Sequence, residues 1–277
     1  MTEQFIDPRP LYATEHPLST RVGVFSRHLV VDAASQSLFH RITEEIARCS
    51  PILDIGCGLG VPLLPVGPTV IDRQDVVGGD LSLRQLQSIA GRASGPAPCL
   101  LQFDAARLPF KERCFGSAVA RHMLYHVADP RLAAAEAARV LRDDGVFVAT
   151  TNSSNSRPEL QSAHRQAVTD LGGRLVERMS TVFDAEAGGE KLLGSFRRVN
   201  AASWSGVLAF PGIDEVLDYY RSAAYFKLAF DDAADRARLA ERVAEILCSR
   251  FGSGPAPLTV GGAVFSCTEP IRGHARG

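Results

Sequence analysis

One segment of the chain combines an acidic side chain with closely spaced glycines. Asp54 lies in an apolar run that begins at Ile52, and Gly56, Gly58 and Gly60 follow it. Such a run suits a buried parallel strand, and the glycines let the chain turn sharply into a helix while a ligand approaches the bare backbone. Asp54 can attract the ammonium group of an amino-acid moiety, directly or through water. The segment therefore predicts a site for a cationic, nucleotide-like cofactor.

The spacing of these glycines argues against two other cofactor classes. A dinucleotide-binding turn has the pattern Gly-x-Gly-x-x-Gly, whose third glycine allows close helix packing. Here Val61 and Pro62 follow Gly60 directly, so that pattern is missed. The chain also lacks the Gly-Lys-Ser/Thr of a phosphate-binding loop, and Asp54 would repel a pyrophosphate.

Two further short apolar runs end in carboxylates. Residues 76–79 lead to Asp80, and residues 99–103 lead to Asp104. Between residues 129 and 141 the alanines recur at helical spacing after an Asp-Pro start, and residues 146–152 form another apolar run. Strands and helices thus alternate from Ile52 to Asn152, which predicts a parallel sheet covered on both faces.

The string Leu53-Asp54-Ile55-Gly56-Cys57-Gly58-Leu59-Gly60 resembles the first motif of the class I (Rossmann-like) methyltransferases that depend on S-adenosylmethionine (SAM). The resemblance implies that Asp80 accepts hydrogen bonds from the two ribose hydroxyls and that Asp104-Ala105 contacts the adenine ring. The cofactor-binding residues expected from it are Tyr12, Asp54, Gly56, Cys57, Gly58, Gly60, Asp80, Leu81, Asp104, Ala105 and Arg121.

The same resemblance implies an α/β fold. We expect a doubly wound, mostly parallel seven-stranded sheet with an antiparallel final strand, and a helical cap over the carboxyl ends of the strands. One feature departs from the family pattern: Pro62 and Pro65 fall within the first turns of the helix expected after the glycines. Because proline costs about 3 kcal/mol in a helix interior, we expect this helix to be short or distorted.

Two histidines follow the strand expected at residues 114–121. Methyl transfer requires a nucleophile held in line with the sulfonium methyl, and a hydroxyl or ammonium acceptor must also lose a proton. An imidazole of ordinary pKa suits that proton transfer. His122 and His126 are therefore the catalytic candidates, although His126 lies within a string common in the family and can equally be structural. Arg121 can bind a carboxylate or the cofactor, or lie in solvent.

The flanking segments are expected to build the acceptor side. We divide the chain into an N-terminal helical cap segment (1–44), the SAM-binding core (45–152), a lid insertion (153–195) and a C-terminal part of the sheet with cap helices (196–277). In the lid insertion we expect glycine breaks at 172–173 and 188–189. In the last part we expect strands at 196–199, 205–210 and 262–267 and helices at 213–222 and 233–251. Its many aromatic residues either fill the core of the cap or form an apolar acceptor pocket.

Composition bounds the remaining possibilities. The chain has 277 residues, is 45% hydrophobic and carries a formal charge of −1. A net charge this close to zero gives no sign of the positively charged surface with which proteins bind nucleic acid. The six cysteines show no Cys-x-x-Cys spacing, which favours a reduced, cytoplasmic setting over disulfides, and no metal site is expected. No long apolar run suggests a membrane segment.

The leading hypothesis is a methyltransferase that acts on an O, N or C atom of a small molecule, in bacterial secondary metabolism such as antibiotic biosynthesis. Two alternatives stay open: an RNA or protein methyltransferase with a local basic patch, and a SAM-binding protein or cyclase on the same scaffold that does not methylate. The expected partner is a small-molecule acceptor, without nucleic acid or membrane, and a homodimer is left open.

Overall fold

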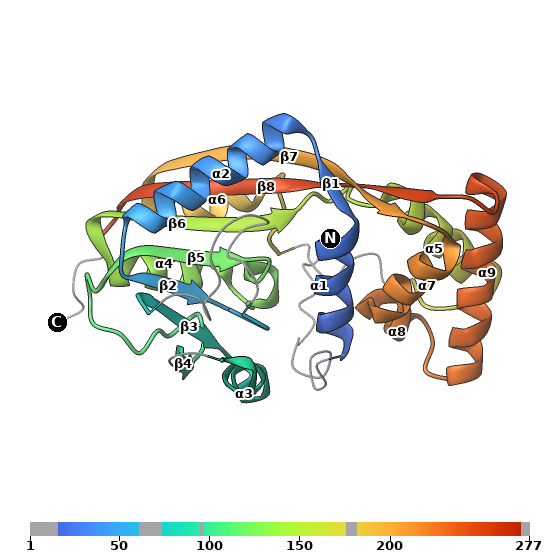
Figure 1. Ribbon diagram of the computed structural model, residues 1–277, viewed down its shortest axis with the longest axis horizontal. Coiled ribbons are helices and arrows are strands. Elements are labelled where there is room, and N and C mark those ends of the chain that lie inside the picture. The colour runs from blue at the N-terminus through green and yellow to red at the C-terminus, as the bar shows by residue number, and fades with distance from the viewer. Residues whose placement is uncertain (1–15, 61–73, 95–96, 176–181, 273–277) are drawn as a thin grey trace.

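The computed structural model describes residues 16–60, 74–94, 97–175 and 182–272. Its centre is one eight-stranded mixed sheet in the order β1-β7-β8-β6-β5-β2-β3-β4 (Figure 1). The strands are β1 (Leu29–Val31), β2 (Ile52–Ile55), β3 (Val76–Asp80), β4 (Cys99–Gln102), β5 (Phe115–Arg121), β6 (Leu141–Asn152), β7 (Phe196–Phe210) and β8 (Ala256–Pro270).

The five strands β2 to β6 run parallel to one another, whereas β8 pairs antiparallel with β6 and with β7. The expected mostly parallel sheet with an antiparallel final strand is therefore confirmed. The expected number of seven strands is wrong by one, because β1 adds an eighth strand antiparallel to β7. A three-residue strand directly after a helix is too short to show a periodicity of its own in the sequence.

The helices are α1 (His16–His28), α2 (Ala33–Arg48), α3 (Leu83–Arg92), α4 (Pro130–Val140), α5 (Pro158–Asp170), α6 (Gly188–Leu192), α7 (Ile213–Ser222), α8 (Ala224–Ala229) and α9 (Ala233–Phe251), with a 3-10 turn η2 at Leu124–His126. Among these described helices, none is long and apolar enough to cross a bilayer.

The apolar side chains of the sheet alternate between two clusters. In β5, Val119 packs with the cluster that includes α2, whereas Ala118 and Ala120 pack with the cluster that includes α4. This alternation follows from the two-residue period of a strand. The helices α2 and α4 consequently cover opposite faces of the sheet (Figure 1).

Two expectations for the C-terminal third are wrong in detail. The strands expected at 196–199 and 205–210 are one continuous strand, β7, because its weakly strand-forming centre pairs residue by residue with β8. The break expected at 188–189 is instead the start of α6. Glycine is required at Gly188 for packing, since a Cβ there would lie 2.9 Å from the Phe183 ring.

The long strands β7 and β8 extend beyond the parallel strands and carry helices at their far end. There α9 packs against α5, α7 and α8, and α1 packs against α7 (Figure 1). These helices lie on the side where the parallel strands end at their carboxyl termini. The division of the chain into cap, core, lid and C-terminal segments stays a prediction. The expectation of a short or distorted helix at Pro62 and Pro65 falls outside the described residues.

Candidate active site

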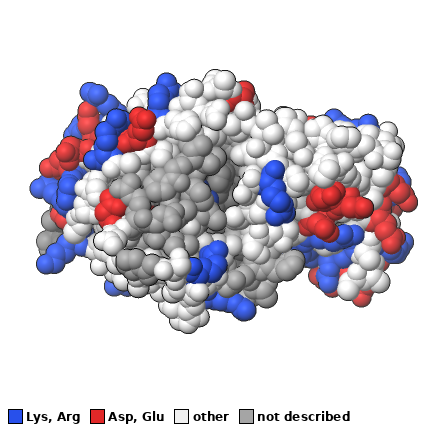
Figure 2. Space-filling view, in the orientation of Figure 1, with Lys and Arg blue, Asp and Glu red and all other residues white. Residues whose placement is uncertain are grey.

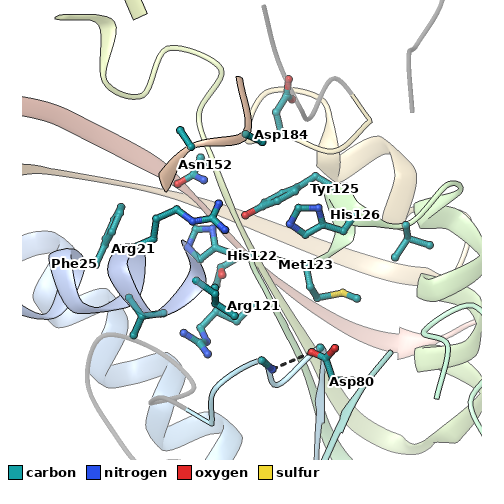
Figure 3. A pocket seen from close by; sticks show the side chains of 18 of the residues that line it. Arg21, Phe25, Asp80, Arg121, His122, Met123, Tyr125, His126, Asn152 and Asp184 are labelled. Atoms are coloured by element: carbon teal, nitrogen blue, oxygen red, sulfur yellow. Dashed lines mark hydrogen bonds between the residues drawn. The ribbon is translucent and has the colours of Figure 1, made fainter. Parts of the chain in front are cut away.

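A cavity of about 1300 Å³ lies at the carboxyl ends of β2, β3, β5 and β6 (Figure 3). Residues of α1, α5 and α7 form its other walls. Ligands of doubly wound sheets bind in this position, beyond the carboxyl ends of the strands. Cavities for a single small ligand measure about 300–1000 Å³, so this one has room for a cofactor and an acceptor together.

The glycine turn after β2 forms one wall of the cavity. Gly56, Gly58 and Gly60 have φ values of +70°, +57° and +65°, which L side chains rarely adopt. A Cβ on Gly56 would lie 2.8 Å from the Met123 Cβ, so this position has no room for a side chain. The turn is tied to β3, because the Gly56 and Cys57 N–H groups both donate to the Gly79 carbonyl, at 2.8 and 2.9 Å.

Asp80 ends β3 and reaches the same turn. Its carboxylate accepts hydrogen bonds from the Gly58 N–H at 3.0 Å, drawn as the dashed line in Figure 3, and from the Ser82 N–H at 2.9 Å. Burial raises the pKa of Asp80, and these backbone hydrogen bonds oppose the rise. Beside it, Leu81 keeps an apolar side chain 48% exposed on the cavity wall. Asp80 and Leu81 therefore offer a ligand in the cavity one polar contact and one apolar contact, next to each other.

Asp54 lies behind the glycine turn and is fully buried. Neither carboxylate oxygen has a hydrogen-bond partner among the described residues. The pKa of Asp54 is raised to about 6: burial raises it most, the positive charge of Arg121 lowers it, and the negative charge of Asp80 raises it. An unpaired buried carboxylate is costly, so a bound cationic group near it would remove part of that cost.

Asp104 and Ala105 follow β4 at the end of the cavity bounded by Leu81. Asp104 is exposed and accepts a hydrogen bond from the Ala106 N–H at 2.9 Å, which fixes the turn. Ala105 is buried, and both residues line the cavity.

His122 and His126 lie on the opposite wall, at the end of β5 and in η2 (Figure 3). The pKa of each imidazole is lowered to about 3, mainly by burial and additionally by nearby arginine charges. His122 also has a φ of +49°, held by the hydrogen bond from its N–H to the Thr150 carbonyl at 3.0 Å. Strained backbone of this kind is characteristic of functional sites.

The structure brings most of the predicted site residues to one cavity. Those that line it are Gly56, Gly58, Asp80, Leu81, Asp104, Ala105, Arg121, His122 and His126. Asp54, Cys57 and Gly60 do not line it and lie behind or within the turn. Tyr12 lies outside the described residues. The functional roles of all these residues stay predictions.

Several lining residues were not singled out from the sequence. Arg21 and Phe25 come from α1, Asn152 from the end of β6, and Arg157 and His164 from α5 or its start. No local pattern marks them, because their position depends on how α1 and α5 pack beyond the sheet. Of the aromatic residues of the C-terminal third, Trp204, Tyr219 and Tyr225 line the cavity.

These residues fit SAM. The buried carboxylate of Asp54 lacks a partner, the bare backbone at Gly56 and Gly58 forms a cradle that a Cβ would fill, and Asp80 presents acceptor oxygens next to it. Among the described residues, no group of three or more His, Cys, Asp or Glu side chains is arranged to hold a metal ion.

Known proteins support the same family. Residues 53–149 match the family described as "Methyltransferase domain". An uncharacterised 37.1 kDa protein in transposon TN4556 of Streptomyces fradiae is 27% identical over 201 residues, which are 63% of this chain and 58% of that protein. The O-methyltransferase cnsE of Penicillium expansum is 38% identical over 112 residues, which are 37% of this chain and 40% of that protein. The chain therefore matches less than two thirds of the length of either relative.

The fold also occurs in solved structures. The [4+2]-cyclase SpnF superposes with a TM-score of 0.55 at 16% identity, covering 96% of this chain and 97% of that one. At this identity the likeness concerns the fold alone.

Proposed function

Residues 53–149 belong to the class I SAM-dependent methyltransferases, and on this basis we propose that the protein transfers a methyl group from SAM to an oxygen, nitrogen or carbon atom of a small molecule. The matched region contains the glycine turn, Asp80, Asp104 and the two candidate histidines His122 and His126.

One observation carries the proposal: two carboxylates and a bare glycine turn converge on one cavity. Asp80 would accept hydrogen bonds from the ribose hydroxyls, and Ala105 with Leu81 would contact the adenine. Asp54, whose oxygens have no partner among the described residues, would attract the ammonium group of the methionine moiety from behind the turn, directly or through water.

The cofactor supplies an electrophilic methyl group on a sulfonium when it is bound. The chain's own residues have to hold an acceptor atom in line with that methyl, about 3 Å away, and keep water out. His122 and His126 have pKa values near 3 and are therefore neutral at physiological pH. A neutral imidazole can orient an acceptor by hydrogen bonding, but so weak a base contributes little to proton removal. The main contribution of His122 and His126 is therefore to position the acceptor.

The cavity lies between the strand ends and the helices α1, α5 and α7, and this position suits a small acceptor better than a macromolecule. Figure 2 supports this choice, since the visible face shows interleaved positive and negative side chains rather than a continuous basic stripe. We further propose a secondary metabolite as the acceptor, in keeping with the O-methyltransferase relative. The cytoplasmic setting and the homodimer remain predictions.

The test is calorimetric titration of the whole chain with SAM and with its product S-adenosylhomocysteine (SAH), followed by incubation with methyl-labelled SAM and pooled bacterial metabolites. We expect saturable binding of both nucleosides and a labelled product with matching release of SAH. Absence of binding would overturn the proposal. Binding without label transfer to any metabolite would point to the non-methylating alternative, and label transferred to added ribosomes or RNA would point to the macromolecular one.

A further inference from the structure

Arg157 places a half-buried positive charge in the cavity at the start of α5. Its Nη1 donates to the Tyr219 hydroxyl at 2.5 Å, and the guanidinium lies 5.9 Å from the centre of the Tyr219 ring. Burial disfavours its charge, but Tyr219 and Tyr225 act in the opposite direction and raise the pKa of Arg157. Among the described groups that act on this charge, none is a carboxylate. Among the described residues the cation therefore has no acidic partner of the kind that an arginine withdrawn from solvent normally has.

The backbone around Arg157 is fixed in a strained conformation. Arg157 has a φ of +62°, which is uncommon for a residue other than glycine. Its N–H donates to the Thr259 carbonyl at 2.6 Å. Two residues on, the Glu159 carboxylate accepts hydrogen bonds from the Thr259 hydroxyl at 2.7 Å and the Thr259 N–H at 3.1 Å. The start of α5 is thus bound to β8, which holds the guanidinium in place before any ligand arrives.

The neighbours of Arg157 form an aromatic and polar wall. Tyr219 and Tyr225 line the cavity beside it. His164 also lines the cavity, is only 4% exposed, and has no hydrogen-bond partner for its Nε2 among the described residues. Its Nδ1 lies 2.6 Å from the Tyr220 hydroxyl, which leaves Nε2 available for a ligand.

Arg157 also lies near the expected site of methyl transfer. Its charge lowers the pKa of His122, after burial and the charge of Arg121. The carboxylates of the cofactor end, Asp80 and Asp104, come from β3 and the turn after β4, whereas Arg157 follows β6. The strand order places β6 three positions from β3 in the sheet, so Arg157 and these two carboxylates come to different parts of the cavity.

We propose that the acceptor is an aromatic carboxylate whose carboxylate pairs with Arg157 and whose ring lies against Tyr219 and Tyr225. This inference rests on the proposed function, because it specifies the substrate class of that same site. The guanidinium offers a planar set of donors that matches a carboxylate in two parallel hydrogen bonds. Tyr219 is a positioning residue, since it holds the guanidinium through its hydroxyl and ring.

The experiment compares two probes of the same shape, 4-hydroxybenzoate and neutral 4-hydroxybenzamide, on the full chain saturated with SAH. Affinities are measured by ligand-observed NMR titration. We expect the wild type to bind the carboxylate about tenfold or more tightly than the amide, as for one charge-assisted contact. Arg157→Met is expected to abolish this preference, and Arg157→Lys is expected to keep part of it. Tyr219→Phe keeps the ring but removes the hydroxyl that holds the guanidinium, and it should therefore reduce the preference.

The matched control is Arg131→Met, which removes an exposed positive charge of α4 outside the cavity. Unchanged SAH affinity and circular dichroism establish that each variant is folded. A wild type without preference for the carboxylate, or an Arg157→Met variant that keeps it, would overturn the inference. Preference for phenyl phosphate over 4-hydroxybenzoate would overturn the choice of carboxylate. Failure of the wild type to bind SAH refutes the proposed function instead, and the probe preference measured without SAH then still decides the role of Arg157.

Discussion

At the scale of single residues, two carboxylates near the glycine turn, Asp80 and Asp54, are held in different states. Asp80 is half-buried and already accepts two backbone hydrogen bonds, which support its charged form. Asp54 is fully buried and has no hydrogen-bond partner among the described residues, so its charged form is strongly disfavoured. Asp80 is therefore prepared to accept hydroxyl groups, and Asp54 is prepared to attract a cation.

Replacing Asp80 should weaken cofactor binding more than it weakens the fold. Each charge-assisted hydrogen bond from a ribose hydroxyl contributes about 1.5–3 kcal/mol. We expect Asp80→Ala to lower the affinity for SAH by roughly 10- to 100-fold or more, measured by calorimetry. The control is Asp144→Ala, which removes an exposed carboxylate outside the cavity. Equal SAH affinities for wild type and Asp80→Ala would rule out the ribose role.

Replacing Asp54 by asparagine should stabilise the ligand-free protein at neutral pH. The folded protein holds the Asp54 proton up to about pH 6, whereas the model value for the unfolded chain is 3.8. The group therefore favours folding below pH 3.8, and this contribution is lost as the pH rises through 6. A rise of this size in pKa corresponds to ~3 kcal/mol at most, since a pKa difference of one is about 1.4 kcal/mol.

We therefore expect Asp54→Asn to raise the free energy of unfolding by about 1–3 kcal/mol at pH 7.5 and to leave it nearly unchanged at pH 3.5. Urea denaturation at both pH values measures the difference. The same variant should bind SAM less tightly, because the negative charge that attracts the ammonium group is gone. An increment of the same size at both pH values would contradict the assignment of this titration to Asp54.

At the scale of elements, the conformation of the turn after β2 depends on positions that carry no side chain. Gly56 combines a positive φ with a Cβ direction that Met123 occupies. Met123 follows β5, the neighbouring strand of the sheet. The turn is therefore fixed by an element distant in sequence as well as by its own backbone.

Two glycine-to-alanine substitutions should separate turn geometry from general helix propensity. We expect Gly56→Ala to lower the free energy of unfolding by about 1–3 kcal/mol, because of its φ and the overlap with Met123. Gly91→Ala, in α3 where a Cβ would meet no atom within 4 Å, should instead raise it by about 0.5–1 kcal/mol. Thermal or urea unfolding of the two variants gives the comparison. Equal effects of the two substitutions would contradict a special role for the turn.

At the scale of the whole molecule, the cavity is assembled from segments far apart in the chain. The parallel strands supply the cofactor end, whereas α1, α5 and α7 supply the remaining walls beyond the strand ends (Figure 1). A ligand that fills this cavity contacts elements from both parts of the chain. Its binding should therefore stabilise the molecule as one unit.

Saturation with SAH should raise the melting temperature of the whole chain. At a ligand concentration 100 times the Kd the stabilisation is about 2.7 kcal/mol, which for a chain of this size corresponds to roughly 5–10 °C. NAD at the same concentration should give no shift, because the glycine spacing and the negative charge of Asp54 disfavour a pyrophosphate. Differential scanning calorimetry makes the measurement. A larger shift with NAD than with SAH would point to a dinucleotide site.

The sequence by itself determined the parallel core and the cofactor end of the site. Each of these features depends on local pattern: an apolar run ending in Asp54 or Asp80, a glycine turn, and alanines at helical spacing between residues 130 and 141. Parallel strands bring their carboxyl ends to one edge, so local signals were sufficient to collect Asp80, Asp104 and the turn.

Only the tertiary structure decided the acceptor side. The short strand β1 exists because β7 offers it an edge, and β7 is continuous because β8 pairs along its whole length. Arg157 enters the cavity because Thr259 and Glu159 fix the start of α5 on β8, a contact between residues about 100 positions apart. The depressed pKa of His122 comes mainly from burial, which the packing of distant elements creates, and to a lesser degree from the adjacent Arg121 and from Arg157 at the start of α5. Pairing and burial of this kind join distant segments, so no local pattern of residues encodes them.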